Sequence, residues 1–315
     1  MFGYLIRRVL YAVPILVGVN VITFALFFFV NSPDDMARLA LGGKHVTAEA
    51  VEKWKADKGY VRPLIFYEAR EGMAQVTDTV FFQKSARMFV FDFGRGDDGR
   101  DIGYEIRTRM WPSLAIAVPT FLVGLACYIS FALLLALFRA TYLDLAGVIL
   151  CVTAMSISSL FYIIGGQYLV SKLWNLVPIS GYDTGLDAWK FLVLPVLIGV
   201  VGGAGASTRW YRTIFIEEMH KDYVRTARAK GLPESRVLFG HVLRNALIPV
   251  LTGVVVVIPA LFLGSLIMES FFAIPGLGSY TIEAINNQDY GGVRALEYSG
   301  SFIYPHGQID LEVSN

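Results

Sequence analysis

Five apolar runs separated by polar segments constrain this chain more than any other feature. The first covers residues 9–30, and the others lie at about 113–138, 145–170, 191–206 and 246–272. The first run has 22 residues, and at about 1.5 Å per helical residue it crosses a hydrocarbon core of roughly 30 Å. A signal peptide would have a shorter core and a small-residue cleavage site, which residues 31–34 lack. The pattern predicts an all-α, polytopic membrane protein.

The composition agrees with a membrane protein and excludes some other classes. Hydrophobic residues make up 55% of the chain, and the formal net charge is +1, which gives no case for nucleic-acid binding. Cys127 and Cys151 both lie inside apolar runs. We interpret them as small core residues, because two such cysteines form no disulfide framework.

The distribution of charge predicts how the helices are oriented. Segment 207–245 holds eight Lys/Arg and four Asp/Glu, whereas segment 171–190 holds two of each. Short cytoplasmic loops carry an excess of basic residues. We therefore place the N-terminus, 139–144 and 207–245 in the cytoplasm. Segments 31–111, 171–190 and 273–292 then lie outside.

The large loop after the first helix, residues 31–111, is polar and holds 13 Lys/Arg and 13 Asp/Glu. Residues Val46–Val51 predict a helix start with Thr47 as its N-cap. Gly94, Gly96 and Gly99, with Asp97 and Asp98 between them, are typical either of a flexible turn or of a metal or phosphate loop. We favour the turn, because no strand precedes this segment and no Gly-Lys-Ser/Thr follows it.

A polar, basic island between Asp222 and Asn245 separates two long apolar runs. From Ile214 onward, apolar residues recur at helical spacing, and Gly231 then ends the predicted helix because glycine accepts a left-handed backbone. Pro233 suits the first turn of a second helix. That second helix has a common side formed by Val237, Leu238, His241 and Val242. The pattern predicts a bent pair of helices that docks a partner, and the alternative is an ordinary basic cytoplasmic loop.

The island also matches a known motif. The motif is Thr226–Leu232 (TARAKGL), followed by Arg244–Pro249 (RNALIP). It closely resembles the signature loop of ATP-binding cassette importer permeases, and more narrowly that of their oligopeptide, dipeptide and nickel branch. The general consensus begins Glu-Ala-Ala and has a glycine four residues after the last alanine. Here Arg225–Ala227 fills the triplet and Gly231 is the glycine, a departure that is typical of the peptide branch.

Further motifs of the peptide permeases follow in the family's order. They are Asp92–Arg95 (DFGR), Arg109–Ser113 (RMWPS), Leu176–Tyr182 (LVPISGY), Glu269–Gly278 (ESFFAIPGLG), Glu283–Ile285 and Asp289–Tyr290. The resemblance therefore extends over residues 1–290. It implies the type I importer permease fold, with five or six transmembrane helices and a large external loop after the first.

The pattern stops after Tyr290. The family would continue with a proline and a sixth apolar helix, whereas this chain continues with Gly291 and Gly292. The longest apolar patch that follows, Phe302–Tyr304, is far too short for a crossing. Either the chain has five spans and an external C-terminus, or its last residues come from a truncated or frame-shifted gene. We predict that this tail is not native-like.

The resemblance implies a transport subunit of the bacterial inner membrane that works by alternating access. It would pair with a second homologous permease as a heterodimer, with two ATP-binding cassette ATPases and with an external solute-binding protein. No catalytic, cofactor or metal constellation is visible in the sequence, so ATP hydrolysis would belong to the partners. The substrate, a peptide or a related small solute, stays open. Alternatives are a self-contained channel, a proton-coupled secondary carrier or a membrane enzyme.

The same resemblance assigns the residues that couple this chain to an ATPase. They are Arg225, Thr226, Ala227, Arg228, Ala229, Lys230, Gly231, Leu232, Glu234, Ser235, Arg236 and His241. The two alanines would permit close helix packing, and Gly231 would give the bend. Arg228, Lys230 and Arg236 would pair with acids of the ATPase, and Glu234 and Ser235 would contact it too. We interpret the nearby acids Glu217 and Glu218, with His220, as a solvated helix face.

A second candidate site is a gate or pathway at the outer end of the last span. Glu269 is the one acid predicted within a span, where acids mark a pathway or an internal pair, although an interfacial hydrogen bond is the alternative. Pro275–Gly278 is typical of a re-entrant or gate loop. The candidate residues are Glu269, Pro275, Gly276 and Gly278. The small residues from Gly199 to Ala206 predict close helix packing, either within the chain or at a dimer interface.

We divide the chain accordingly. The segments are 1–30, the N-terminal segment and first transmembrane helix; 31–111, the external domain; 112–290, the permease core with coupling loop 207–245; and 291–315, the atypical tail.

Overall fold

The fold is all-α within the residues that the structure describes. This computed structural model describes residues 14, 16–26, 28–29, 32–42, 46–67, 72–85, 88, 92–96, 99–185, 187–287, 289 and 291–301. The only non-helical pairing in these ranges is an isolated bridge between Arg95 and Asp101. The fold class predicted from the sequence is confirmed. The chain forms two compact units, one from Met1–Thr108 with Tyr280–Ile309, the other from Arg109–Ser279.

Short helices form much of the first unit. They are α2 (Pro33–Ala40), α3 (Ala48–Lys58), α4 (Ala74–Thr77) and α5 (Val80–Ser85). The backbone N–H of Ala50 donates to the Thr47 hydroxyl at 3.4 Å, which confirms the predicted helix start. The core of this unit includes Phe24, Phe28 and Met36, so the described part of the first apolar run, a helix over Leu16–Leu26 and residues beyond it, packs against α2.

Residues 291–301, which belong to the predicted atypical tail, are helical. Ala295 and Tyr298 are buried there. The Arg294 guanidinium lies 5.4 Å from the centroid of the Phe24 ring and 5.9 Å from that of Phe28, within the range of cation–π attraction. This helix is therefore part of the core of the first unit. Residues 302–315 lie outside the described residues.

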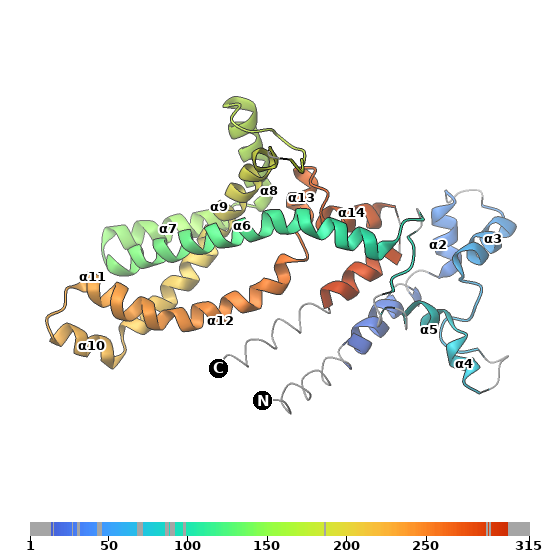
Figure 1. Ribbon diagram of the computed structural model, residues 1–315, viewed down its shortest axis with the longest axis horizontal. Coiled ribbons are helices and arrows are strands. Elements are labelled where there is room, and N and C mark those ends of the chain that lie inside the picture. The colour runs from blue at the N-terminus through green and yellow to red at the C-terminus, as the bar shows by residue number, and fades with distance from the viewer. Residues whose placement is uncertain are drawn as a thin grey trace. The chain divides into compact units, whose positions relative to one another are not determined.

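Long helices dominate the second unit (Figure 1). The helices that form it, or continue into it, are α6 (Ile102–Leu137), α7 (Tyr142–Ser156), α8 (Ser159–Gly166), the π-helix η2 (Gln167–Leu173), α9 (Ala188–Met219), α10 (Asp222–Ala229), α11 (Glu234–Val237), the π-helix η3 (Leu238–Val242), α12 (Leu243–Leu261), α13 (Leu266–Phe271) and α14 (Leu277–Asn286). Among the described residues, Ile102–Leu137, Ala188–Met219 and Glu234–Leu261 are long and apolar enough to cross a membrane, and Tyr142–Leu173 would make a fourth span as a bent pair.

Two predicted runs are broken, and each break has a local cause. The run at 145–170 bends by 90° between α7 and α8, where Ile157 takes an extended conformation. The Tyr162 hydroxyl donates to the Ala154 carbonyl at 2.9 Å, which satisfies a carbonyl near the break. The run at 246–272 ends as a helix at Leu261, because Gly264 has a left-handed φ of 72° and turns the chain toward α13.

Helix α9 is the centre of the second unit, since α7, α8 and α12 all pack against it. Its small residues make this packing close. A Cβ at Gly199 would lie 2.6 Å from Thr120 of α6, and one at Gly205 would lie 2.5 Å from the Cys151 carbonyl oxygen of α7. The small-residue face of α9 therefore packs within the chain at these positions.

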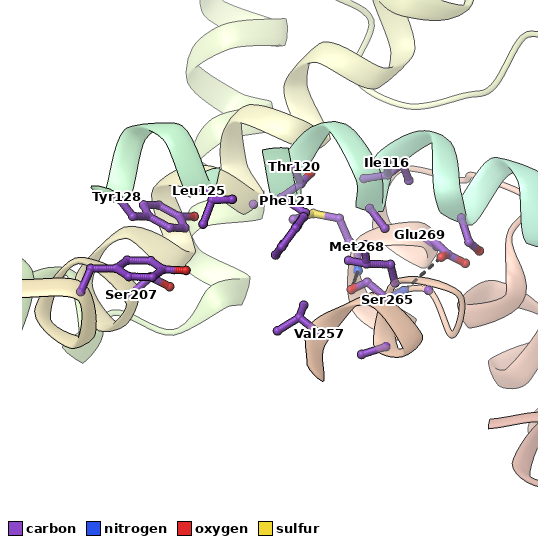
Figure 2. A pocket seen from close by; sticks show the side chains of 17 residues that line it. Ile116, Thr120, Phe121, Leu125, Tyr128, Ser207, Val257, Ser265, Met268 and Glu269 are labelled. Carbon is purple, nitrogen blue, oxygen red and sulfur yellow. Dashed lines mark hydrogen bonds between the residues drawn. The ribbon is translucent and has the colours of Figure 1, made fainter. Parts of the chain in front are cut away.

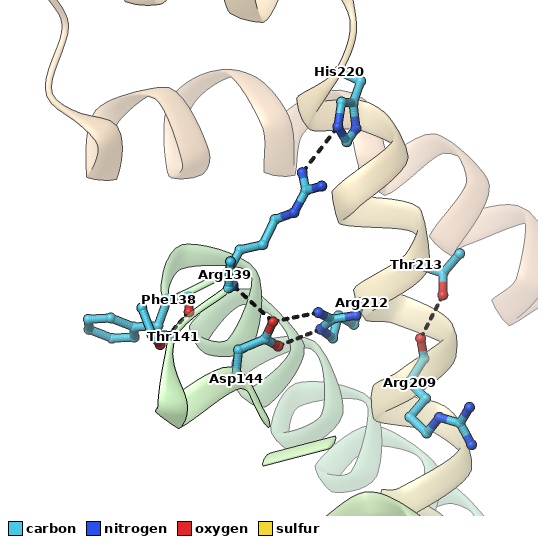
Figure 3. A network of polar contacts seen from close by, with 9 residues as sticks. Phe138, Arg139, Thr141, Asp144, Arg209, Arg212, Thr213 and His220 are labelled. Atoms are coloured by element: carbon cyan, nitrogen blue, oxygen red, sulfur yellow. Dashed lines mark hydrogen bonds and ion pairs between the residues drawn. The ribbon is translucent and has the colours of Figure 1, made fainter. Parts of the chain in front are cut away.

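A partly buried ion pair also fixes α7 to α9 (Figure 3). Arg212 donates to both Asp144 oxygens, from Nε at 2.8 Å and from Nη2 at 2.7 Å. The backbone N–H of Ala140 donates to the same carboxylate at 3.2 Å, and Ala140 itself has a left-handed φ of 61°. Bidentate pairs of this kind are among the stronger polar contacts. The pair holds the turn between α6 and α7 against α9.

The close packing at Gly205 predicts an asymmetry between two helical glycines. Gly205→Ala should destabilise the chain by about 1–3 kcal/mol, because the added methyl group meets backbone. Gly165→Ala should be neutral or slightly stabilising, since nothing lies within 4 Å of a Cβ there. Thermal unfolding of the two purified variants in detergent would measure the difference. Equal stability of both variants would contradict close packing at Gly205.

Candidate coupling loop and adjoining cavity

The coupling loop, residues 207–245, contains a break that the sequence pattern missed. A continuous helix from Ile214 to Gly231 was predicted, and this was wrong. Helix α9 ends at Met219, and α10 begins at Asp222 after Lys221, whose backbone is extended (φ −71°, ψ 153°). Helix α10 of the coupling loop is therefore a short helix separate from α9.

Glu218 organises this break from a buried position. It is 7% exposed, so its interpretation as part of a solvated face was wrong, although Glu217 and His220 are exposed as predicted. The Tyr223 hydroxyl donates to Glu218 at 2.7 Å and the Lys221 ammonium lies 2.9 Å away. A signal was present in the sequence, since Glu218 lies at helical spacing from the apolar residue Phe215.

The Tyr223 phenol joins α10 to the end of α9. Burial, and then the hydrogen bond to Glu218, raise the pKa of Tyr223 to about 12. The phenol is therefore a neutral donor at physiological pH. Tyr223 thus connects α10 to Glu218 at the end of α9.

The predicted bend at Gly231 is confirmed. Gly231 has a φ of 76°, its N–H donates to the Arg228 carbonyl at 2.9 Å, and the Leu232 N–H donates to the Ala227 carbonyl at 3.4 Å. This pair of hydrogen bonds is the Schellman motif, which requires a left-handed backbone at the position of Gly231. Pro233 precedes α11 as its N-cap, close to its predicted place at the helix start.

An ion pair spans the turn at Gly231. Arg228 donates from Nε to Glu234 at 3.1 Å and makes a second contact from Nη2 to the other carboxylate oxygen. The hydrogen bond to Glu234 raises the pKa of Arg228 above its ordinary value. Both residues are among those predicted to contact an ATPase. Within the described chain they pair with each other and join α10 to α11.

One face of the coupling loop is buried in a single apolar cluster with the membrane helices. Val224 and Ala227 of α10, Val237 of α11, and Leu238 and Val242 of η3 are between 0% and 5% exposed. They pack with residues of α6, α9 and α12, namely Ala132, Leu133, Ala136, Tyr211, Phe215, Met219, Ala246 and Val250. Each large apolar side chain buried in this way contributes about 1.5–3 kcal/mol. We call this set the coupling cluster.

The opposite face of the loop is exposed and basic. The exposed residues among those predicted for coupling are Arg225, Thr226, Arg228, Ala229, Lys230, Gly231, Glu234, Ser235 and Arg236, whereas Leu232 and His241 are half-buried. Lys230 and Arg236 have no ion-pair partner within the described residues. Ala229 is exposed, so within the described chain close packing involves Ala227 alone. Figure 1 shows α10 and α11 near the end of α12 that is farther from α13.

Glu269, the candidate gate residue, holds the loop after α13 together. It is 1% exposed, and it accepts the backbone N–H groups of Ser265 and Ser279, each at 3.0 Å. Ser279 lies in the first turn of α14, where a negative charge is favourable. The Ser113 hydroxyl of α6 accepts the Leu277 N–H at 2.8 Å. These contacts favour the alternative of a local hydrogen-bonding role for Glu269.

The glycines of the predicted gate loop permit this arrangement. A Cβ at Gly276 would collide with the Glu269 carboxylate and with Ser113, and one at Gly278 would lie 2.6 Å from the Ser265 carbonyl carbon. The structure therefore brings Glu269, Gly276 and Gly278 together. Pro275 is exposed beside them.

A cavity of about 420 Å³ extends from Ser265 and Glu269 to Tyr211 of the coupling cluster. Figure 2 shows Ser265 and Glu269 at one end of it and Tyr128 and Ser207 at the other. Its walls come from α6, α9, α12 and α13, and they are mostly apolar with a few hydroxyls. Tyr211 belongs to both the cavity wall and the coupling cluster. The sequence could not identify this cavity, because its walls come from four helices far apart in the chain.

Comparisons with known proteins agree with this geometry. Residues 128–303 match the family described as binding-protein-dependent transport system inner membrane component, and residues 1–82 match the N-terminal family of such membrane components. The first match extends past Tyr290, where the predicted motifs stop. The chain therefore belongs to the family of binding-protein-dependent transport system inner membrane components.

Curated relatives align with nearly the whole chain. The glutathione transport system permease protein GsiC of Pectobacterium atrosepticum is 30% identical over 315 residues, which are 99% of this chain and 96% of that protein. GsiC of Salmonella typhimurium is 28% identical over 316 residues, with 99% and 96% covered. A peptide transport system permease protein of Brucella suis biovar 1 is 29% identical over 309 residues, with 96% and 93% covered.

These findings define the class of the protein. It is a permease subunit of an ATP-binding cassette importer, a multi-pass protein of the bacterial inner membrane and a transport subunit rather than an enzyme. An importer of this class works with ATPase subunits and a binding protein.

The junction at Glu218 generates a prediction for α10. Tyr223→Phe removes a hydrogen bond to a buried carboxylate, which costs about 1.5–3 kcal/mol. Amide hydrogen exchange in α10, measured by mass spectrometry, should therefore accelerate roughly ten-fold or more. Tyr142→Phe is the matched control, because Tyr142 is 92% exposed. Unchanged exchange in the Tyr223 variant would show that the hydroxyl does not hold α10 in place.

Proposed function

We propose that this permease transmits ATP-driven motion through residues 222–245 and forms half of a translocation pathway for peptides or related small solutes. It would pair with a second homologous permease, two ATP-binding cassette ATPases would dock on the cytoplasmic coupling loop, and an external solute-binding protein would deliver the substrate. The N-terminus would lie in the cytoplasm and segment 31–111 outside.

The two-sided character of the coupling loop is the observation that carries this proposal. Its outer face is exposed and basic, with Lys230 and Arg236 available to acidic groups of a partner. Its inner face belongs to the coupling cluster. A partner that displaces the outer face must therefore displace α6, α9 and α12, or open the cluster at the cost of exposing its apolar side chains.

The turn at Gly231 would let the loop transmit motion because it is rigid. The Arg228–Glu234 pair and the Schellman bonds fix α10 to α11, and Tyr223 fixes α10 to the end of α9. A force on the coupling loop would then move α10 and α11 together as a rigid body, without bending the turn between them. This is the mechanical requirement for a coupling element between an ATPase and a membrane domain.

The cavity provides the other end of the pathway. Tyr211 lies in the coupling cluster and in the cavity wall, and Leu125 and Tyr128 pack on the cluster and line the cavity too. Motion of the loop would therefore change the shape of the cavity, which is the basis of alternating access. The loop held by Glu269, with Gly276 and Gly278, would act as the gate at the external end.

The walls of the cavity suit a small solute with amide and apolar groups. Six side chains bring hydroxyls to it, namely Ser113, Thr120, Tyr128, Ser207, Tyr211 and Ser265, and the Thr120 hydroxyl has no hydrogen-bond partner among the described residues. A short peptide offers both backbone donors for such hydroxyls and apolar side chains for the walls. The names of the relatives, glutathione and peptide permeases, support this substrate class.

A pair of glycine variants tests the coupling proposal. Gly231→Val should abolish binding-protein-dependent uptake while the protein still inserts, because a β-branched residue is strongly disfavoured at a φ of 76°. Gly240→Val is the matched control, since nothing lies within 4 Å of a Cβ there and its φ is not left-handed. Uptake of a defined peptide mixture into proteoliposomes that contain the whole complex would be measured by mass spectrometry.

The outcomes separate the remaining hypotheses. Normal, ATP-dependent uptake with Gly231→Val would defeat the coupling role of this loop. Uptake by the permease alone, without ATP or a binding protein, would favour a self-contained channel or a proton-coupled carrier instead.

A further inference from the structure

A second cavity, of about 370 Å³, lies between α7 and α9 and has no part in the proposed transport pathway. Val148 and Met155 of α7 and Ala206 of α9 form its apolar side. Arg209, Trp210 and Arg212 of α9 form its polar side. A cavity with one apolar wall and two arginines suits an anionic, amphipathic molecule.

The two arginines differ in whether a carboxylate of the described chain neutralises their charge. Arg212 is held by Asp144 through Nε and Nη2. Arg209 is exposed, and the hydrogen-bond contact of its guanidinium among the described residues is the Met155 sulfur at 3.6 Å, which is a weak acceptor. Figure 3 shows the Arg209 side chain lying apart from the Asp144–Arg212 pair. The cavity therefore carries one positive charge that no carboxylate of the described chain balances.

The position of these residues along α9 is that of a membrane boundary. The apolar run of this helix ends at Ala206, and Arg209 is the first charged residue after it. Helix α9 has 32 residues, or about 48 Å of length, so part of it extends beyond a hydrocarbon core of roughly 30 Å. Trp210, which is 49% exposed, is of the residue type enriched at such boundaries.

We propose that this cavity binds the phosphate headgroup of an anionic phospholipid, with Arg209 as the main contact. The Arg209 guanidinium would donate charge-assisted hydrogen bonds to the phosphate, and the acyl chains would lie along Val148 and Met155. Free phosphate has the same charged group, but it would leave the apolar wall unused. The proposed orientation of the chain would place this headgroup in the cytoplasmic leaflet, but the lipid contact itself does not depend on that orientation.

Native mass spectrometry of the purified full-length chain tests this proposal. The probes are dioleoylphosphatidylglycerol, which is anionic, and dioleoylphosphatidylcholine, which has no net charge. The wild-type chain should retain phosphatidylglycerol at least five-fold more than phosphatidylcholine. Arg209→Gln should abolish that preference, and Arg209→Lys should keep most of it, because it preserves the charge.

Arg107→Gln provides the matched control. Arg107 is exposed, so this variant removes the same charge at another place and should keep the wild-type preference. Unchanged retention of phosphatidylcholine and an unchanged elution volume in size-exclusion chromatography would show that Arg209→Gln is folded. A folded Arg209→Gln chain that keeps the wild-type preference would overturn the proposal.

Two further outcomes would also overturn it. Displacement of the bound lipid by millimolar inorganic phosphate would identify a site for free anions. Loss of the Arg209-dependent lipid when the chain is co-purified with a second permease would assign this cavity to a subunit interface. A failure of the transport proposal, by contrast, would leave the lipid preference unchanged, because this experiment requires neither ATP nor a transported substrate.

Discussion

Burial of one face of the coupling loop against the membrane helices is the interaction on which the rest of the structure depends. Val224, Val237 and Val242 lie in the same cluster as residues of α6, α9 and α12. Exposing this face would cost several kcal/mol, since each large apolar side chain contributes about 1.5–3 kcal/mol. The loop therefore cannot move far without the helices that it contacts. In the proposed function, that constraint would make the loop a mechanical connection between a partner ATPase and the cavity.

The polar contacts at the loop set its shape rather than hold it to the membrane domain by themselves. The Arg228–Glu234 pair is partly exposed, so it contributes modestly to stability, but it fixes the angle at Gly231. The contact between Tyr223 and Glu218 is shielded from water and sets the break before α10. Glu269, in the cavity wall, plays a similar part by accepting two backbone N–H groups. The coupling loop and the loop after α13 are thus each held by a buried carboxylate.

Much of this could be predicted from the sequence, because apolar run length and glycine position are local signals. Three long spans and the bent pair Tyr142–Leu173, the all-α class, the bend at Gly231 and the cap at Thr47 follow from such signals. The breaks at Ile157 and Lys221 could not be predicted from such signals, because helical periodicity continues through both. The contact of Ser113 with Leu277 joins residues 164 positions apart, and no local pattern encodes it. For the same reason the cavity could be recognised only once four helices were placed together.

The most direct test of the account is site-specific photo-cross-linking in the assembled importer. A photoreactive amino acid would replace Ser235, which is exposed on the coupling loop, or Met73, which is 88% exposed in the segment assigned to the outside. The account predicts a cross-link to an ATP-binding subunit from position 235 and none from position 73. Cross-links to that subunit from position 73, with none from position 235, would contradict both the orientation of the chain and the role of the loop.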